Sequence, residues 1–127
     1  MLEIKQPALF KTSSYINGNW HPNNATFNVA NPATDEVIAQ VCDASIEQAT
    51  LAVRAAKKAF KAWSTMPANE RATLLRNWFN LMMEHQNDLA RILTLEQGKP
   101  LAEAKGEIAY GASFIEWFAE EGKRGII

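Results

Sequence analysis

A change of pattern near Ser45 divides the 127-residue chain into two parts. No lysine or arginine occurs between Lys11 and Arg54, and the stretch before Ser45 is rich in Asn, Thr, Val and Pro. Beyond Arg54, apolar residues recur at every third or fourth position, which is the period of a helix. The predicted fold is therefore α+β and mostly helical, with an N-terminal β-hairpin region at about 14–42 and about four helices over about 45–124.

Two hairpins are predicted in the β region. Asn17-Gly18 separates two short runs of strand-forming residues, and this pair tolerates the positive φ angles of a type I′ turn. A second pair of strands is predicted at 27–29 and 37–41, joined by a longer turn. A lone hairpin is marginally stable in water, so we expect both hairpins to pack on helices.

Capping residues mark the predicted helix ends. Ser45 and Gln48 have the spacing of a capping box, in which each side chain bonds to the other residue's backbone N–H. Further boundaries are predicted at Pro67, Asn87, Gly98 and Pro100.

Each predicted helix carries an apolar stripe, which predicts the side that faces the core. The first helix also has basic residues from Arg54 to Lys61, which predict a solvated face. The last helix is unusually aromatic near its end, and an aromatic stripe on a helix is usually core. The predicted core residues include Ile46, Ala49, Val53, Ala56, Phe60 and Trp63; then Leu74, Leu75, Trp78, Leu81 and Met82; then Leu89, Ile92 and Leu93; and finally Leu101, Ala104, Ile108, Ile115 and Phe118.

Charge and composition exclude several classes of partner. A net charge of −1 and a pI near 6.1 leave no basic field for a phosphate backbone, so we expect no nucleic-acid partner. No apolar run approaches the roughly 20 residues that span a bilayer, so no membrane partner is expected. The single cysteine, Cys42, forms no intramolecular disulfide and predicts a reducing, cytoplasmic location.

The residues alone reveal no active site. The chain has no phosphate-binding glycine loop and no zinc motif. Cys42 is followed by Asp43, and an adjacent carboxylate disfavours a thiolate, so a structural cysteine is predicted. Glu96 lies near a predicted helix C-terminus, where the dipole disfavours a carboxylate, so binding of a cation through oxygen ligands is one alternative.

Three stretches of the sequence resemble a known family. The order SYINGNW, NPATDEVIAQV and AVRAAKKAFKAW is similar to the N-terminal part of aldehyde dehydrogenases. The later stretches TLEQGKPLAEAKGEI and SFIEWFAEE look most like the succinate-semialdehyde dehydrogenase branch. The resemblance runs from about residue 14 to 124, and implies that 1–127 is the N-terminal part of an NAD(P)-binding domain.

The resemblance implies oxidation of an aldehyde to a carboxylate. A full-length enzyme of the family, the parent enzyme, performs this reaction, and this chain alone is expected not to. Family members bind NAD or NADP, and a cysteine attacks the aldehyde before hydride transfer and hydrolysis of the thioester. Succinate semialdehyde is the implied substrate. The family's catalytic and cofactor-binding residues align beyond Ile127, so none is assigned here. The chain alone is therefore expected to bind no cofactor and to be inactive.

The resemblance also implies two sets of site residues. Relatives hold a monovalent cation through carbonyls before the NP turn and through an acidic residue, which correspond here to Val29, Ala30 and Glu96. The last helix flanks the aldehyde channel in relatives, and the corresponding channel residues are Tyr110, Phe114 and Trp117. The core interpretation of these three aromatic residues stands as the alternative.

A second function class stays open beside the enzyme fragment: a stand-alone helical interaction or structural module. In the full enzyme that the resemblance implies, these helices pack against a sheet that this chain lacks, so some of their apolar faces are expected to stay uncovered. The aromatic end of the last helix, with Phe114, Trp117 and Phe118, is the predicted exposed patch, and such patches commonly mark contacts between molecules. We therefore expect a homo-oligomer, with helices exchanged between copies as one form of it.

Overall fold

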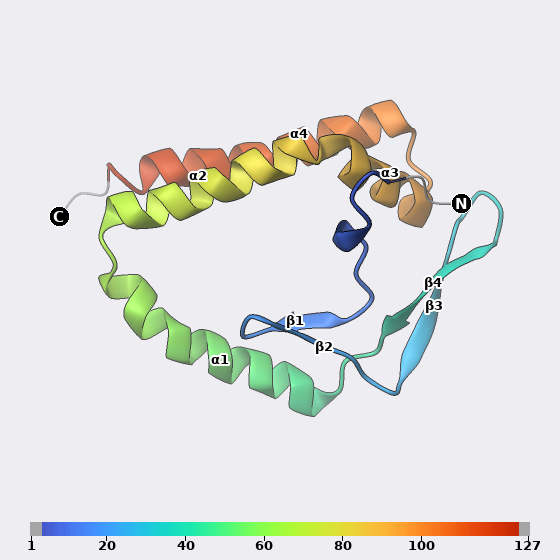
Figure 1. Cartoon of the computed structure of the whole chain (residues 1–127), viewed down its shortest axis with the longest axis horizontal. Helices are drawn as coiled ribbons and strands as arrows, with labels where there is room; N and C mark the ends of the chain where they lie inside the picture. The colour runs from blue at the N-terminus through green and yellow to red at the C-terminus, as the bar shows by residue number, and fades with distance from the viewer. Residues whose placement is uncertain (1–3, 125–127) are drawn as a thin grey trace. The chain divides into compact units, whose positions relative to one another are not determined.

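The computed structural model describes residues 4–124, in which the predicted α+β, mostly helical fold is confirmed. These residues form two compact units, one made of 4–9 together with 66–124 and the other of Phe10–Thr65 (Figure 1). The elements of the first unit are the 3₁₀ turn Pro7–Leu9 and the helices α2 (Ala68–Glu84), α3 (Gln86–Gln97) and α4 (Leu101–Glu121). The second unit holds β1 (Ser14–Ile16), β2 (Asn19–His21), β3 (Thr26–Ala30), β4 (Val37–Cys42) and α1 (Ile46–Thr65).

The β1–β2 hairpin forms where the Asn-Gly pair predicts it. Tyr15 pairs with Trp20 across the antiparallel ladder. Asn17 and Gly18 have φ angles of 52° and 82°, as a type I′ turn requires. Ile16 is buried at the end of β1. The turn chemistry and the burial of Ile16 both favour this register.

The β3–β4 hairpin is also confirmed, with strands slightly longer than predicted. Phe27 pairs with Val41, and the ladder has an irregularity between Val29 and Ala30. Its loop contains Asp35, whose φ of 58° is left-handed and is well tolerated by Asp. The loop is closed because the backbone N–H of Asp35 donates to the Asn31 carbonyl at 2.8 Å.

Helix α1 begins with the predicted capping box. The Ser45 hydroxyl accepts from the Gln48 N–H at 3.2 Å, and the Gln48 side chain accepts from the Ser45 N–H at 3.0 Å. The predicted core stripe of this helix is wrong, however, because Ile46 and Val53 are 82% and 69% exposed. Its small residues face the β1–β2 hairpin instead, across a pocket of about 280 Å³. The alanines that line this pocket are Ala52, Ala55, Ala56 and Ala59.

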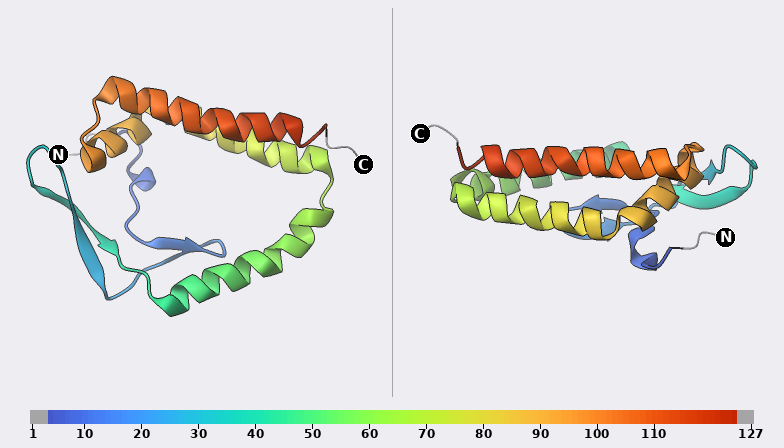
Figure 2. Two further views of the ribbon diagram at one scale, coloured as in Figure 1. Left: turned by 180° about the vertical axis from the view of Figure 1, so that it is seen from behind. Right: turned by 90° about the horizontal axis from the view of Figure 1, so that it is seen from above.

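The first unit is built around alanines. Helices α2 and α4 run side by side (Figures 1 and 2). Helix α3 packs against α4 at the end where α2 stops and α4 begins. The buried apolar residues of these helices are all small, because a small side chain lets two helix backbones approach closely. They are Ala72 on α2, Ala90 on α3, and Ala104, Ala112 and Ala119 on α4.

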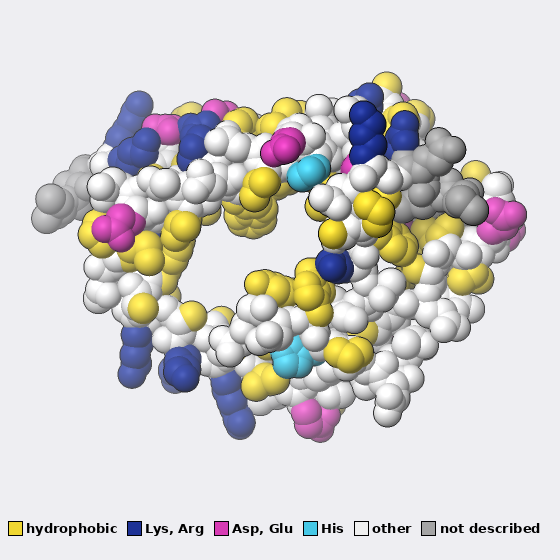
Figure 3. Space-filling model, in the orientation of Figure 1, with side chains coloured by type: hydrophobic (Ala, Val, Ile, Leu, Met, Phe, Trp, Pro, Cys, Tyr) yellow, Lys and Arg dark blue, Asp and Glu magenta, His cyan; other side chains and the backbone are white. Residues whose placement is uncertain are grey.

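Several larger apolar residues are more exposed than predicted, whereas others, such as Leu75 and Ile92, are half-buried. Leu74, Trp78 and Leu81 of α2 were expected in the core, yet each is about half exposed. Helical periodicity identifies a stripe without saying which stripe meets a neighbour, and here the alanine side of each helix makes the contact. Figure 3 shows hydrophobic side chains at the surface, together with lysine and arginine side chains that project from α1. That basic face is solvent-exposed, as predicted.

Helix ends in this unit follow the sequence with one exception. Gly98 ends α3 with a left-handed φ of 78°, and Pro67 and Pro100 precede α2 and α4. The predicted cap at Asn87 is wrong, because α3 already begins at Gln86 and His85 joins it directly to α2. Of the helices within 4–124, none is long and apolar enough to cross a membrane.

Candidate functional site

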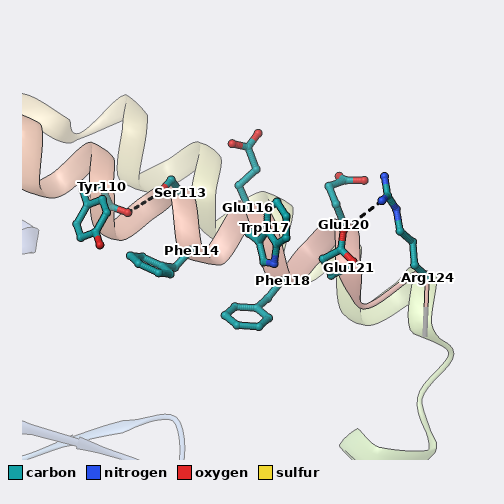
Figure 4. A pocket seen from close by; sticks show the side chains of 9 residues that line it. All are labelled: Tyr110, Ser113, Phe114, Glu116, Trp117, Phe118, Glu120, Glu121 and Arg124. Atoms are coloured by element: carbon teal, nitrogen blue, oxygen red, sulfur yellow. Dashed lines mark hydrogen bonds and ion pairs between the residues drawn. The ribbon is translucent and has the colours of Figure 1, made fainter. Parts of the chain in front are cut away.

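The candidate site is a groove along the C-terminal half of α4, with a volume of about 740 Å³. Four aromatic residues of this helix line it, and we call them the aromatic face: Tyr110, Phe114, Trp117 and Phe118. Spacings of three and four residues place their side chains on one side of the helix. Figure 4 shows Phe114 and Phe118 pointing to the same side, while Glu116 points to the other. The groove therefore contains all three predicted channel residues.

The aromatic face is open to solvent. Tyr110 and Trp117 are 65% and 62% exposed, and Phe114 and Phe118 are 49% and 62% exposed. The interpretation of this stripe as core is therefore wrong within the described residues. The structure confirms instead the predicted exposed patch. A role of these residues in an aldehyde channel stays a prediction.

Side chains at the N-terminal end of the aromatic face contact one another. The rings of Tyr110 and Phe114 meet edge to face, with centroids 4.9 Å apart and an interplanar angle of 78°. The Ser113 hydroxyl donates to the Tyr110 carbonyl at 2.7 Å (Figure 4). The groove thus has a hydroxyl-bearing wall at Tyr110 and purely apolar rings at Phe114 and Phe118.

Ion pairs fix the other side of α4 to α2. Arg76 of α2 donates from one guanidinium nitrogen to Glu116 and from another to Glu120, each at 2.6 Å. The guanidinium, and after it the Lys123 ammonium, lower the pKa of the Glu120 carboxyl. The two acceptors raise the pKa of Arg76 in turn, with the Glu116 hydrogen bond as the larger cause. These bonds fix the orientation of α4 about its own axis, with Glu116 and Glu120 towards Arg76 and the aromatic face on another side of the helix.

The predicted cation ligands come from both units. Val29 and Ala30 lie at the irregular step of β3, and Glu96 lies in the last turn of α3, where it is exposed. Two of these ligands would be backbone carbonyls. Within residues 4–124, no group of three or more His, Cys, Asp or Glu side chains could hold a metal ion. The set Val29, Ala30 and Glu96 stays a prediction.

Cys42 lies at the end of β4, as a structural cysteine was predicted to do. Its sulfur lies 3.8 Å from the Ser14 hydroxyl and 3.8 Å from the His21 carbonyl oxygen. The His21 ring contacts the Ile16 carbonyl through Nε2 at 3.2 Å. The thiol thus sits within the strand network of the second unit.

Sequence reasoning missed Asp88, the buried acid of the first unit. The residue is 5% exposed, and its carboxylate accepts from the backbone N–H of Lys5 at 3.1 Å and of Gln6 at 2.9 Å. The Lys5 bond is the larger cause of a lowered Asp88 pKa, which burial partly opposes. An acidic residue in the first turn of a helix looks like an ordinary dipole partner, and nothing local predicts a bond to residues more than 80 positions away.

The fold and groove define an α+β domain segment that presents an apolar surface. The model of the aldehyde dehydrogenase family matches residues 20–126, so the chain belongs to the aldehyde dehydrogenase family. The resemblance seen in the sequence is thereby confirmed.

Two curated relatives are similar over nearly the whole chain. The NADP(+) succinate-semialdehyde dehydrogenase of Escherichia coli K12 is 54% identical over 97% of this chain and 26% of its own length. The glutarate-semialdehyde dehydrogenase of Pseudomonas putida KT2440 is 55% identical over the same shares. The chain therefore spans about a quarter of the length of the curated relatives it matches.

Solved structures share the backbone as well. A crystal structure of an Escherichia coli NADP-dependent enzyme superposes with a TM-score of 0.94 at 55% identity, covering 96% of this chain and 26% of that one. The betaine aldehyde dehydrogenase of Staphylococcus aureus in complex with NAD+ superposes with a TM-score of 0.86 at 30% identity, covering 91% of this chain and 24% of that one. Structures of the family thus contain NAD+.

Proposed function

We propose that residues 1–127 are the N-terminal part of the cofactor-binding domain of an NAD- or NADP-dependent aldehyde dehydrogenase that oxidises succinate semialdehyde to succinate. The observation that carries this proposal is the identity of 54% to the Escherichia coli succinate-semialdehyde dehydrogenase across 97% of the chain. The NADP(+) in that enzyme's name and the NAD+ in the betaine aldehyde dehydrogenase complex support this class of cofactor.

Glutarate semialdehyde is the main competing substrate, because a glutarate-semialdehyde dehydrogenase is 55% identical to this chain. The two substrates share an aldehyde and a terminal carboxylate and differ by one methylene. One methylene in a pocket changes selectivity by roughly 10- to 200-fold, so a kinetic comparison separates them.

The chain alone is proposed to be inactive and to bind no cofactor. The groups in contact with the sulfur of its one cysteine are the Ser14 hydroxyl and the His21 carbonyl oxygen, and neither group is a cation that would stabilise a thiolate nucleophile. No glycine-rich phosphate loop occurs in the sequence. A cytoplasmic location stays a prediction from the single cysteine.

Two sets of residues belong to the same proposal. Tyr110, Phe114 and Trp117 flank the path of the aldehyde, which is supported by their position in one apolar groove. Val29, Ala30 and Glu96 contribute to a monovalent-cation site, which is supported by the resemblance alone. Replacing Glu96 by Gln in a full-length enzyme should weaken cation binding. A higher potassium or sodium concentration should then be needed for half of the cation-dependent increase in stability.

A stand-alone interaction module is the second candidate, and the exposed aromatic face is the observation that favours it. Under either proposal, the isolated chain self-associates through this face. Sedimentation velocity at micromolar concentration tests the association. A monomer that binds no hydrophobic dye would contradict it.

A chimera tests the enzymatic proposal. The matched N-terminal quarter of the Escherichia coli succinate-semialdehyde dehydrogenase is replaced by this chain, and reduction of NADP+ by succinate semialdehyde is followed at 340 nm. We expect activity from the chimera and none from the 127-residue chain. A folded chimera without turnover on either semialdehyde would favour the interaction module, and turnover by the chain alone would refute its proposed inactivity.

A further inference from the structure

We propose that the Asn17-Gly18 turn is a site of spontaneous deamidation, which the folded β1–β2 hairpin suppresses and opening of the hairpin permits. The product is an isoaspartate at residue 17, which prevents the hairpin from forming again. Asn17 is the one asparagine of the sequence that is followed by glycine. The inference adds a modification site in the second unit and does not depend on the proposed function.

The reaction needs only water as a co-reactant. The Gly18 backbone nitrogen attacks the side-chain amide carbon Cγ of Asn17, so an N–Cγ bond forms and the Cγ–Nδ2 bond breaks. The proton of the Gly18 N–H leaves with the amide nitrogen as ammonia, and a five-membered succinimide ring results. Water then opens the ring at either of its two carbonyls. One product is aspartate, and the other is isoaspartate, in which the main chain runs through the former side chain.

The surroundings of the turn offer no steric obstacle to this reaction. Asn17 and Gly18 are both exposed. A side chain on the residue after an asparagine hinders the attacking nitrogen, and glycine has none. Even a Cβ added at Gly18 would have no atom within 4 Å. Protection of Asn17 must therefore come from the conformation of the backbone.

That conformation opposes ring closure. Asn17 and Gly18 have φ angles of 52° and 82°. In a type I′ turn the first central residue has φ and ψ of about +60° and +30°. With this ψ the Gly18 nitrogen lies nearly anti to Cβ of Asn17 about the Cα–C bond, so it cannot reach Cγ. A five-membered ring needs these two atoms eclipsed, and the peptide between Asn17 and Gly18 must rotate by nearly half a turn.

A side-chain hydrogen bond holds this peptide in its unreactive orientation. Nδ2 of Asn19 donates to the Asn17 carbonyl oxygen at 3.2 Å. The rotation that brings the Gly18 nitrogen to Cγ carries this carbonyl away, so the bond must break. The strand ladder opposes the same rotation, because Ile16 pairs with Asn19 and is buried. The succinimide is therefore expected to form from the open hairpin, which is a local unfolding event.

Conversion to isoaspartate changes the hairpin permanently. It adds one carbon atom to the main chain of a turn in which only two residues separate the paired strands. Turn length sets the register of a hairpin, so the pairing of Tyr15 with Trp20, whose ring centroids are 5.0 Å apart, is lost. Asn17 also lines the alanine pocket beside α1, so the contact of the hairpin with this helix is lost as well.

Peptide mapping of the aged 127-residue chain tests the inference. The chain is kept at mildly alkaline pH with or without guanidinium chloride, and mass spectrometry follows the replacement of NH2 by OH at Asn17. Asn24 is exposed and precedes alanine, so it serves as the internal reference in the same digest. Relative to Asn24, we expect conversion of Asn17 to be at least about tenfold slower in the folded chain than in the unfolded chain, because opening limits it.

A matched pair of variants tests the hydrogen bond. Asn19→Ala removes the donor to the Asn17 carbonyl, so conversion in the folded chain should rise about two- to tenfold, the effect of one hydrogen bond. In guanidinium chloride the rate should not change. Asn28→Ala makes the same substitution in β3 of the other hairpin and should leave the rate at Asn17 unchanged. Equal folded-state rates in the two variants would refute the role of Asn19.

The modified chain tests the consequence. Its isoaspartate form carries an added negative charge and is isolated by anion exchange. Hydrogen exchange of the hairpin amides should be fast in this form and slow in Asn17→Asp, which adds the charge without lengthening the main chain. Equal relative rates at Asn17 in the folded and unfolded chain would overturn the inference, as would native exchange in the isoaspartate form. The same mapping on the covalent chimera keeps the test decisive if the chain alone does not fold.

Discussion

The two sides of helix α4 show how differently one helix can use its apolar residues. The alanine side, with Ala104, Ala112 and Ala119, is fully buried and brings α4 close to α2 and α3. The opposite side carries much larger apolar surface, yet Phe114 and Trp117 stay about half exposed or more. Size therefore does not decide burial here. Close approach of helix backbones decides it, and this favours the smallest side chains.

The strongest test of this comparison enlarges the buried side. Replacing Ala112 by Leu inserts three carbons where no space is left, so we expect α4 to separate from its neighbours and the unfolding free energy to fall by about 3 kcal/mol. Urea unfolding of the 127-residue chain, followed by tryptophan fluorescence, measures the loss.

Ser113→Leu is the matched control for this substitution. Ser113 adjoins Ala112 but is exposed in the groove, so the same new side chain should change stability by less than about 0.5 kcal/mol. Equal losses at the two positions would show that the alanine side is not the tightly packed one.

Asp88→Asn should have the next largest effect, because the asparagine side chain has one acceptor oxygen and leaves either the Lys5 or the Gln6 N–H donor without an acceptor. The Asp88 pKa is lowered in the folded state, so its stabilisation is present above the unfolded pKa of about 3.9 and is lost as the pH falls through the folded value. The variant should therefore be less stable than the parent at pH 7. The difference should vanish near pH 2.

Glu103→Gln removes another first-turn acid, at an exposed position of α4, and serves as the control for Asp88→Asn. We expect little change at either pH. Hydrogen exchange at Lys5 and Gln6 gives a local readout, since only the Asp88 variant should accelerate it. Unchanged exchange at these two amides would contradict the role of Asp88 in holding the N-terminal segment.

A smaller effect is expected from Arg76→Met, which removes the bonds to Glu116 and Glu120 but keeps an apolar stem. The thermal midpoint should fall modestly, and its dependence on salt should weaken because screened charges are gone. Arg124→Met is the control, since Arg124 pairs with Glu121 at the end of its own helix and is mostly exposed. An equal decrease of the thermal midpoint in both variants would show that the ion pairs between α2 and α4 add nothing to stability.

Local chemistry was predictable from the sequence, and packing partners were not. The Asn17-Gly18 turn, the Ser45 capping box and the Gly98 helix end each depend on residues within a few positions, and all three are confirmed. The cap at Asn87 failed because α2 and α3 join at His85 almost without a break. A capping side chain signals a helix start only where the preceding chain leaves the helical path.

The candidate site was predicted in part. The spacing of Tyr110, Phe114 and Trp117 places them on one side of a helix, and the structure shows them lining one groove. Whether that side is core depends on which helices lie beside it, and this information is not local to α4. Asp88 was missed for the same reason, because its donors are at the other end of the chain.

The smallest effect on stability is expected from Phe118→Ser on the exposed side of α4. Phe118 is 62% exposed, so its replacement removes little buried surface and should change the unfolding free energy by less than about 0.5 kcal/mol. Binding of a hydrophobic dye and self-association should both decrease, because the aromatic face loses one of its four rings. A loss of stability near that of Ala112→Leu would instead place Phe118 in the core, as its helical spacing alone predicts, and would erase the contrast between the two sides.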